Sequence, residues 1–310
     1  MRGPTAAIAL ALALGATGCL LTIVTRNVPQ LAAPARRLPH RITQPVRDDA
    51  RLAVLWVGHS TLLVQLDDKL VLTDPVFTSA VGQLSHRLVE PGIDPADLPA
   101  RIDAVLISHM HFDHLSVGSL AMIAPRIARL FVPVGGLVYV PDDGYPAQEL
   151  AWWEEWQDGD GLVITAVPVR HVGGRYGIDR AWQPRAFTGY VVRYHGLTVY
   201  FGGDTGYDRE DFVAARERFP AIDLALLPIA PIEPRDFMSR THLDPGEALR
   251  AFADLGARWM VPIHFDTFIN SYDEVGDAPR LLREAMRERG LGDDRVILLA
   301  QGEQRVLVAR

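Results

Sequence analysis

The sequence predicts an α/β protein built as a sandwich of two stacked β-sheets with helices on the outside. From residue 51 onward, short apolar runs typical of strands alternate with helix patterns, and the strands come in groups with helices between the groups. No solenoid or propeller period repeats along the chain. The 310 residues are 48% hydrophobic and 22% charged, which excludes disorder and fibrous repeats and is enough for one large domain or two ordinary ones.

The first segment has the layout of an export or anchoring signal. Residues 5–25 are apolar and uncharged and lie between Arg2 and Arg26. Within them, Ala16-Thr17-Gly18-Cys19 resembles the lipobox of bacterial lipoproteins, in which the cysteine is lipidated and becomes the new N-terminus. An uncleaved membrane helix and a simple secretory signal are the alternatives, because ~20 apolar residues suffice to cross a bilayer.

The arginines that follow this segment argue against the uncleaved membrane helix. Five of them follow the apolar run within residues 26–50, so an uncleaved helix obeying the positive-inside rule would leave the body in the cytoplasm. We therefore expect residues 1–25 to be a signal or lipoprotein anchor, with the body membrane-anchored and facing the periplasm or cell exterior. Residues 26–50, with Pro29, Pro34, Pro39 and Pro45 among the arginines, are predicted to form an extended tether.

The charge distribution limits the partners. Residues 1–50 carry +4, which leaves −11 for residues 51–310 out of the total of −7. An acidic body is a poor general binder of nucleic acid, and nuclease function would need a basic surface or an added RNA-binding domain. We expect a small-molecule or lipid substrate and a membrane contact through the anchor, with no nucleic acid partner. The oligomeric state is not predicted.

The elements of the body follow in order without a linker-like break, so residues 51–310 are predicted to be one domain. A meander comes first, with Asp67-Asp68-Lys69 as a turn. A helix begins at Asp244, where an N-cap Asp, Pro245 and Glu247 coincide. Another helix covers residues 278–289 and stops at Gly290. The predicted strands are 52–57, 61–66, 70–73, 104–108, 130–132, 162–169, 190–194, 197–201, 224–228, 259–263 and 296–299.

A histidine-rich motif directly follows the buried strand 104–108. It reads His109-Met110-His111-Phe112-Asp113-His114. Residues two apart in an extended segment share a face, so His109 and His111 are able to converge on one ion, while Asp113 and His114 reach a second ion beside it. Cys19 is the only cysteine, so any metal must be held by His, Asp and Glu.

Three later strands add ligand-type residues at their carboxyl ends. His171 follows strand 162–169, Asp204 follows strand 197–201 in a glycine-rich turn, and His264 follows strand 259–263. In layered α/β folds this is the edge where sites assemble. A carboxylate has two oxygens and is able to bridge two cations, and glycines beside it let the backbone come close to an ion.

The His-x-His-x-Asp-His run followed by a distant His, an Asp and a last His resembles the metallo-β-lactamase superfamily. The resemblance implies a four-layer αββα sandwich and two divalent metal ions, with Zn²⁺ expected. It implies that one ion is held by His109, His111 and His171 and that Asp204 bridges both. The other ion would be held by Asp113, His114 and His264.

Within this superfamily the sequence is most similar to the N-acylphosphatidylethanolamine-hydrolysing phospholipase D group and its bacterial relatives, which include ascorbate-phosphate lactonase-like proteins. The likeness departs after His171, where that group has a Trp-Ser-type continuation and this chain has Val172-Gly173-Gly174-Arg175. The walls of the substrate site are therefore expected to differ. The shared segments are residues 56–61, 73–76, 152–155, 203–207, 226–229, 233–238 and 242–245.

Residues outside the metal shell have expected roles too. His59, in a Gly-His-Ser-Thr turn, is a candidate for catalysis by resemblance, with a structural hydrogen bond as the alternative. Asp74 is expected to brace a histidine ligand or a loop. His242 is a candidate for contacting substrate or protonating the leaving group, and Asp113 counts as both ligand and catalytic carboxylate. The tryptophans 152, 153 and 156 are expected to pack a helix on the core, with the wall of an apolar substrate groove as the alternative.

These features predict a binuclear metal-dependent hydrolase in which a metal-bridging hydroxide attacks a phosphorus or carbonyl centre. A phosphodiesterase of phospholipase D-like type, acting on a lipid-like substrate, is the first expectation; a lactone, cyclic phosphate or thioester is the alternative. A di-iron oxidoreductase is disfavoured because no flavin-binding pattern follows within these residues. A non-catalytic metal-binding protein is disfavoured by the complete ligand set.

Overall fold

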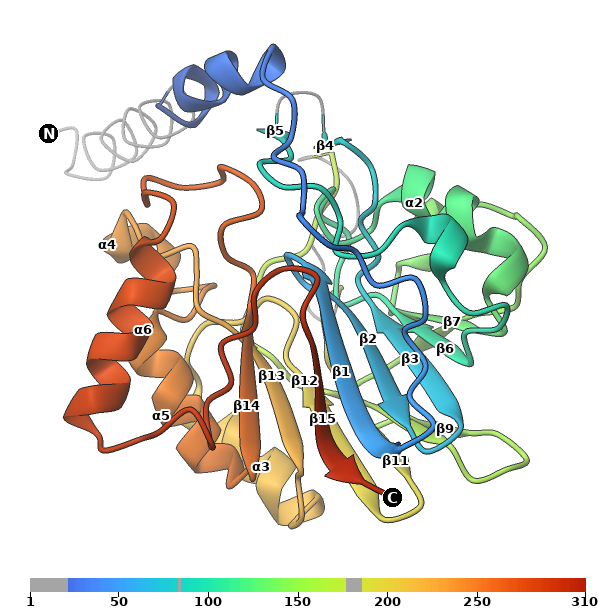
Figure 1. Cartoon of the computed structure of the whole chain (residues 1–310). Coiled ribbons are helices and arrows are strands. Elements are labelled where there is room, and N and C mark those ends of the chain that lie inside the picture. Colours follow the sequence, from blue (N-terminus) through green and yellow to red (C-terminus); the bar gives the residue numbers. More distant parts are fainter. Residues whose placement is uncertain (1–21, 83–84, 177–185) are drawn as a thin grey trace, which may run out of the picture.

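Two β-sheets packed face to face form the centre of the computed structural model, which describes residues 22–82, 85–176 and 186–310 (Figure 1). One sheet has the strand order β15-β1-β2-β3-β6-β7-β8 and the other β14-β13-β12-β11-β10-β9. The first comprises β15 (Gln304–Ala309), β1 (Ala50–Gly58), β2 (Thr61–Leu66), β3 (Lys69–Thr73), β6 (Ala104–Leu106), β7 (Leu130–Pro133) and β8 (Ala147–Leu150). The second comprises β14 (Trp259–Ile263), β13 (Leu224–Pro228), β12 (Leu197–Phe201), β11 (Gly189–Tyr194), β10 (Val163–Val167) and β9 (Glu155–Gln157).

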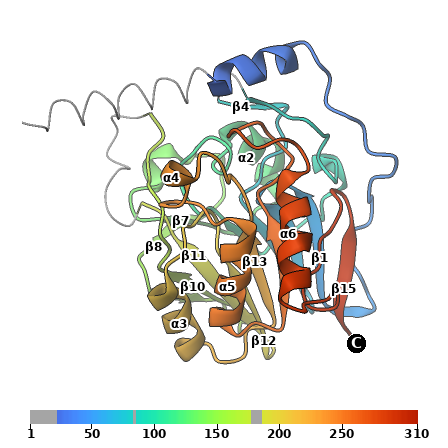
Figure 2. The same cartoon turned by 90° about the vertical axis from the view of Figure 1, so that its left-hand side faces the viewer.

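Helices cover the outer face of each sheet, which completes four layers (Figures 1 and 2). On the seven-stranded sheet lie α2 (Val117–Ile123) and the short turns η2 (Pro95–Asp97), η3 (Ala124–Arg126) and η4 (Leu137–Tyr139). On the six-stranded sheet lie α3 (Arg209–Arg218), α5 (Pro245–Leu255) and α6 (Asp277–Glu288), with α4 (Arg235–Met238) near one end. The predicted αββα sandwich is confirmed.

The side chains of β1 point alternately to the two faces of its sheet, and this explains why the sheet is covered on both faces. Leu52, Val54 and Trp56 point into the core between the two sheets, whereas Leu55 and Val57 pack in the second core beneath α2. Side chains of successive strand residues point to opposite faces, so a strand that is apolar throughout must be covered on both sides. The parallel pairs β12–β13 and β13–β14 are joined by the crossover helices α3 and α5. Helix α5 begins with the predicted capping box of Asp244 and Glu247.

The predicted central strands and the 67–68 turn are present, and the differences lie at the edges of the sheets. Strands β8, β9 and β15 were not predicted; each is an edge strand with partly exposed, mixed polar residues, so its pattern is weak. The strand predicted at 296–299 is wrong, because only Val296 forms a bridge, to Met260. The helix expected around the tryptophans is also wrong: residues 151–153 form the β8–β9 turn, and Trp156 lies in β9. The expected core packing is confirmed for Trp153 and Trp156.

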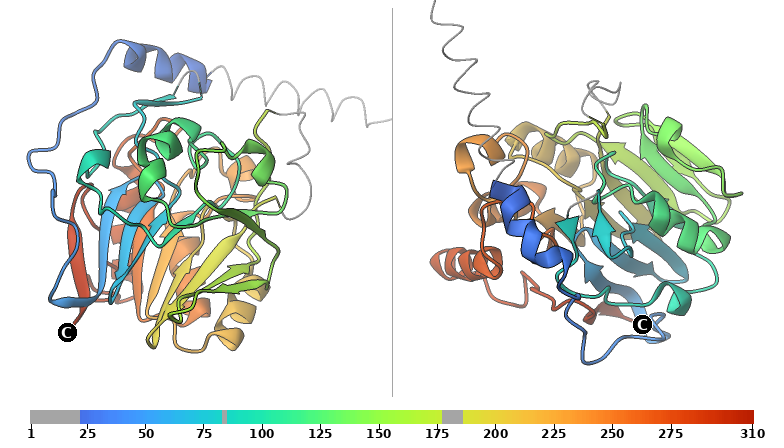
Figure 3. Two further views of the ribbon diagram at one scale, coloured as in Figure 1. Left: turned by 90° about the vertical axis from the view of Figure 1, so that its right-hand side faces the viewer. Right: turned by 90° about the horizontal axis from the view of Figure 1, so that it is seen from above.

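The N-terminal part of the described chain lies against the body. Residues 22–27 are helical and continue into η1 (Val28–Leu31), after which the chain runs without long regular elements to β1. It crosses the end of the molecule that carries the small hairpin of β4 (Ala80–Val81) and β5 (Ser85–His86) (Figures 1 and 3). The segment predicted to be a tether is thus bound to the body rather than free.

Cys19 and residues 1–21 of the predicted anchor lie outside the described residues. In the part of the chain that the structure describes, no helix combines the length and apolarity needed to cross a membrane. The division into signal, tether and hydrolase domain stays a prediction.

Candidate metal centre

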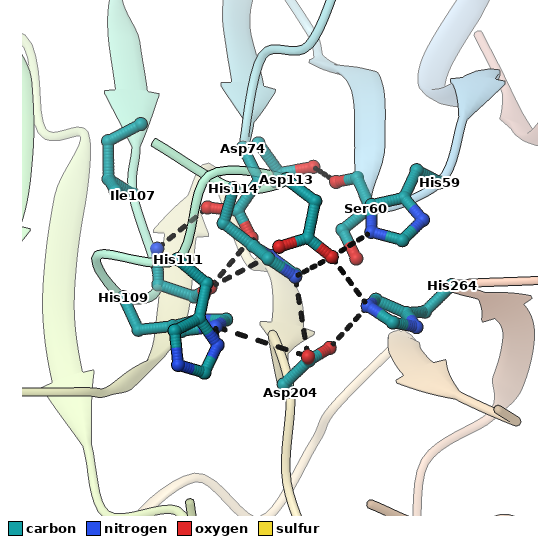
Figure 4. A network of polar contacts seen from close by, with 12 residues as sticks. His59, Ser60, Asp74, Ile107, His109, His111, Asp113, His114, Asp204 and His264 are labelled. Carbon is teal, nitrogen blue, oxygen red and sulfur yellow. Dashed lines mark hydrogen bonds and ion pairs between the residues drawn. The ribbon is translucent and has the colours of Figure 1, made fainter. Parts of the chain in front are cut away.

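The predicted site residues converge at one end of the two sheets, where strands from both layers finish (Figure 4). His59 follows β1, and the motif 109–114 follows β6 in the seven-stranded sheet; Asp204 follows β12 and His264 follows β14 in the six-stranded sheet. His171 stands a few residues beyond β10. All seven predicted ligands meet here, together with His59 and His242, in overlapping groups of His and Asp side chains whose ligand atoms lie within 4.8 Å of one another.

The first group consists of His109, His111 and His171. The His109 Nε2 atom lies 2.8 Å from His111 Nδ1, and His171 Nε2 lies 3.5 Å from the same Nδ1 atom. His109 and His171 are buried and His111 is partly exposed. The group therefore presents three imidazole nitrogens to one point and contains no carboxylate.

The second group consists of Asp113, His114 and His264, as predicted, with His59 added. The Asp113 Oδ2 atom lies 3.1 Å from His59 Nε2 and 3.7 Å from the Nε2 atoms of both His114 and His264. His59 thus points into the site and contacts Asp113, which is the structural contact considered from the sequence; its role in catalysis stays a prediction.

Asp204 lies between the two groups. Its Oδ2 atom is 3.3 Å from His114 Nε2 and 4.0 Å from the Nε2 atoms of both His109 and His171, and its Oδ1 atom is 3.1 Å from His264 Nε2. This one carboxylate therefore reaches imidazoles of both groups. The adjacent Gly203 has a left-handed φ of 56°, and a Cβ atom there would lie 2.3 Å from that of Ser108. The glycine serves close packing of the β12 end against the motif strand.

A buried carboxylate and a hydroxyl orient two of the histidines. Asp74 Oδ2 lies 2.7 Å from His114 Nδ1, as expected for a bracing residue, and also accepts a hydrogen bond of 2.6 Å from the Ser108 hydroxyl. The Ser108 hydroxyl is in turn 3.0 Å from His109 Nδ1. With their Nδ1 atoms held from behind, His109 and His114 direct Nε2 into the centre. Ser108 was not predicted; its position immediately before the motif was the available signal.

His171 and His242 lie beside each other at Asp204, with ring centroids 5.1 Å apart. The carbonyl oxygen of Thr241 lies 3.0 Å from His171 Nδ1, which directs His171 Nε2 inward. His242 Nδ1 lies 3.6 Å from Asp204 Oδ2, and its side chain is 13% exposed, so it stands at the accessible edge of the centre. No sequence signal could have identified the Thr241 carbonyl, because every residue carries one.

The two turns that carry His59 and His264 support each other. Both residues have left-handed backbone conformations, with φ of 55° and 64°. The His264 amide donates to the His59 carbonyl over 3.0 Å, and the His59 amide donates to the buried hydroxyl of Thr267 over 2.8 Å. Non-glycine residues adopt this conformation rarely, and it persists only where surrounding bonds fix it. These bonds join the ends of the two sheets at the site.

Arg175 fixes the motif loop from outside. One guanidinium nitrogen donates to the carbonyls of Met110 (3.0 Å) and Leu115 (2.7 Å), which bracket most of the motif. The same guanidinium lies 4.3 Å from the ring centroid of Phe112. Arg175 belongs to the stretch where the sequence departs from the phospholipase D group, and in this chain that stretch supports the ligand loop.

Protonation differs between the two groups. Burial and the neighbouring histidines His114, His111 and His171 lower the pKa of His109 well below its usual value. Burial alone would lower the pKa of His264, but the Asp204 and Asp113 carboxylates raise it to about 9. Burial likewise opposes the charged form of His114, yet Asp204, Asp113 and Asp74 raise its pKa well above the ordinary range.

The carboxylates stay charged. Burial alone would raise the pKa of Asp204, but His264 and His114 hold it well below the usual range. Asp113 behaves in the same way, with burial opposed first by His114 and then by His264 and His59. Buried anions of this kind require cations beside them.

The donor set fits divalent metal ions. Five buried atoms of the site have no hydrogen-bond partner in the described structure: His114 Nε2, Asp204 Oδ1, His242 Nδ1, and both ring nitrogens of His264. Buried polar atoms are rarely left unpaired without a reason. Imidazole nitrogens and carboxylate oxygens are the ligands that Zn²⁺ and similar ions take in the absence of cysteine.

Comparisons with known proteins agree with this centre. The model of the beta-lactamase superfamily domain matches residues 69–265, well over half of the chain. N-acyl-phosphatidylethanolamine-hydrolyzing phospholipase D 1 of Caenorhabditis elegans is 32% identical over 285 residues, covering 85% of this chain and 78% of that protein. An uncharacterized protein of Mycobacterium tuberculosis is 36% identical over 249 residues, covering 76% of this chain but only 64% of its own length.

A solved structure shows the same fold. The metallo hydrolase Igni18 of Ignicoccus hospitalis superposes with a TM-score of 0.61 at 22% identity, over 82% of this chain and 97% of that one. On the ligand motif, the layered fold, the family match and the phospholipase relative together, the chain belongs to the metallo-β-lactamase superfamily of metal-dependent hydrolases.

Proposed function

We propose that the protein is a binuclear metal-dependent phosphodiesterase that acts on a substrate with an apolar tail. The observation that carries the binuclear part is the position of Asp204. Its Oδ2 atom lies 4.0 Å from the Nε2 atoms of His109 and His171 in the first group, and its Oδ1 atom lies 3.1 Å from His264 Nε2 in the second group. If only one metal ion were bound, one of the two ligand groups would have no cation to coordinate.

Each of the two metal ions would have its own set of ligands. His109, His111 and His171 would hold one ion, and Asp113, His114 and His264 the other, with Asp204 shared and His59 supporting Asp113. Bound divalent ions supply a nucleophilic hydroxide near neutral pH and stabilise charge that develops on the substrate. Asp74, Ser108 and the Thr241 carbonyl keep the imidazoles in the orientation that this requires.

His242 contacts the substrate in this proposal. Burial lowers the pKa of His242 to about 4, although Asp204 opposes the shift, so its imidazole is neutral at pH 7. A neutral imidazole donates a hydrogen bond through N–H but holds no spare proton for a leaving group. Of the two roles considered from the sequence, this favours substrate contact over proton donation.

A comparison of leaving groups tests the role of His242. We expect His242→Ala to lower kcat/KM about 10-fold to 100-fold, by similar factors for phosphodiesters with good and with poor leaving groups. His242→Gln, which keeps an N–H donor, should recover part of the loss. A loss confined to poor leaving groups would instead make His242 the general acid.

The substrate class rests on the relatives and on the N-terminus. The Caenorhabditis elegans relative is named as a phospholipase D that hydrolyses an N-acylated phospholipid, and the similarity covers most of both chains. The apolar residues 5–25 supply the other support, because a lipoprotein anchor would place the body at a bilayer, where lipid phosphodiesters are found. The body would then face the periplasm or the cell exterior.

Metal analysis combined with a substrate screen tests the proposal. Protein purified without chelators should contain close to two divalent ions, with zinc expected, and should hydrolyse phosphodiesters. Turnover of lactones or thioesters with no phosphodiester hydrolysed would overturn the substrate class and leave the hydrolase. Iron with redox activity in place of hydrolysis would favour the oxidoreductase alternative.

A further inference from the structure

We infer that the N-terminal segment holds the metal-centre end of the protein directly against a lipid bilayer, by a short link instead of a long tether. The inference rests on the membrane anchor of the proposed function and adds an orientation to it. Its interaction surface is the strap face, defined as residues 22–31, the loop 269–275 and helix α4.

Two residues fix the strap to the body. The Arg26 guanidinium donates to the carbonyls of Ser271 and Asp273, each over 2.8 Å, and lies 2.9 Å from the Glu274 carboxylate. Asn27 is only 1% exposed and donates to the Ile269 carbonyl over 2.9 Å. Three carbonyls of one loop are thus satisfied by two neighbouring residues. Surface segments that move freely do not bury an asparagine in this way.

The bound strap shortens the reach of the anchor. If residues 26–50 were free, the 32 residues from Cys19 to Arg51 would span up to about 110 Å. With Arg26 bound to the loop, only seven residues separate Cys19 from a fixed point on the body, and they span at most about 25 Å. The lipid anchor therefore determines which side of the body faces the membrane.

That side carries the metal centre. The loop 269–275 follows His264 and Thr267, and it lines a small hollow of about 30 Å³ whose walls include His59 and His264. In the view from above, the strap crosses the same end of the molecule as β4, β5 and α4 (Figure 3). A bilayer at the strap would therefore lie at the same end of the body as the centre (Figure 1).

The exposed side chains of the strap face suit a lipid surface. Large apolar residues stand out of it: Val28, Leu31, Phe237 and Val275 are 55%, 47%, 62% and 65% exposed. Arginines follow the strap, among them Arg37 with a side chain 91% exposed. Peripheral membrane proteins bind a bilayer in two ways at once: apolar residues enter the interface, and basic residues attract anionic headgroups.

Depth-dependent quenching tests the orientation without any substrate. The full-length protein is reconstituted on vesicles of phosphatidylcholine and phosphatidylglycerol that contain a headgroup nitroxide lipid. A fluorophore is attached at Val275→Cys on the strap face or at Ala221→Cys, an exposed position before β13 at the opposite end. The unsubstituted protein is the labelling control for Cys19.

We expect quenching several-fold stronger at position 275 than at position 221. The double variant Arg26→Ala/Asn27→Ala should stay on vesicles but lose part of this difference. The next residue bonded to the body is then Arg36, whose amide and carbonyl pair with Leu88 and Glu90, so the chain from Cys19 to that point spans up to about 60 Å. Arg305→Ala, on the edge strand β15 and away from the strap face, is the control and should keep the difference. Failure of the full-length protein to bind vesicles, equal quenching at both positions, or a double variant that keeps the full difference would each overturn the inference. Since no turnover is measured, an orientation confirmed in a protein that hydrolyses no phosphodiester would refute only the substrate class.

Discussion

The two ligand groups share Asp204 but differ in charge. The first group, of His109, His111 and His171, has no carboxylate of its own, and burial lowers the pKa of all three imidazoles. The second group contains Asp113 and is backed by Asp74, and its His114 and His264 have raised pKa values despite burial. The comparison teaches that one position is ready to take a cation, while the other must first release protons to do so.

The largest expected effect comes from the residue that both groups share. Asp204→Ala should lose both ions and lower kcat/KM by at least about 10³-fold, because the ions contribute several kcal/mol of transition-state stabilisation. Metal analysis and kinetics on one preparation check this. Asp223→Ala, at the opposite end of β12, removes a carboxylate that accepts from the Thr198 amide and should retain both ions. If Asp204→Ala still bound two ions, Asp204 would not be a ligand shared by both.

Two single substitutions should separate the groups. Asp113→Ala removes the second group's own carboxylate, and His111→Ala removes a nitrogen from the first group. Each variant is expected to keep about one ion per chain, since the other group retains its histidines and Asp204. Loss of both ions from either variant would mean that the groups do not bind independently.

A smaller, one-sided effect is expected for Asp74→Asn. Asp74 contacts His114 directly and reaches His109 only through Ser108, so the second ion should bind about 10-fold to 100-fold more weakly and the first should change less. Competition with a chromophoric chelator measures both affinities. Asp103→Asn serves as control, because its buried carboxylate accepts from the Leu70 amide at the far end of β3 and should affect stability alone. Equal weakening at both positions would contradict the asymmetry.

The smallest effect is expected at Arg175. Arg175→Gln removes donors to the Met110 and Leu115 carbonyls and should weaken metal binding by a few-fold in both groups, since the loop carries ligands of each. Arg175→Lys should recover part of the affinity, whereas Arg305→Gln on the edge strand β15 should have no effect. A loss of thermal stability with unchanged metal affinity would show that Arg175 supports the fold only.

The parts of the molecule that could be predicted from sequence are those that depend on local pattern. The central strands are apolar on both faces, and the ligands follow them at fixed places, so their pattern identifies both. The edge strands β8, β9 and β15 were not predicted because their mixed polar and apolar residues are mostly only partly buried, which leaves a weak pattern. The Thr241 carbonyl, the Arg175 contacts and the bound strap at Arg26 depend on partners 60 or more residues away, which no local pattern encodes.

Calorimetric titration of the metal-free protein with zinc tests the two unequal positions most directly. At pH 7.5 in buffers of different ionisation enthalpy, we predict two binding events and the release of about two protons per chain, because His114 and His264 are protonated before the second group binds. In Asp113→Ala, one event should remain and the proton release should largely disappear. Raising the pH through about 9 should strengthen the proton-linked event and leave the other unchanged. A single event, or two events that release equal numbers of protons, would contradict the account.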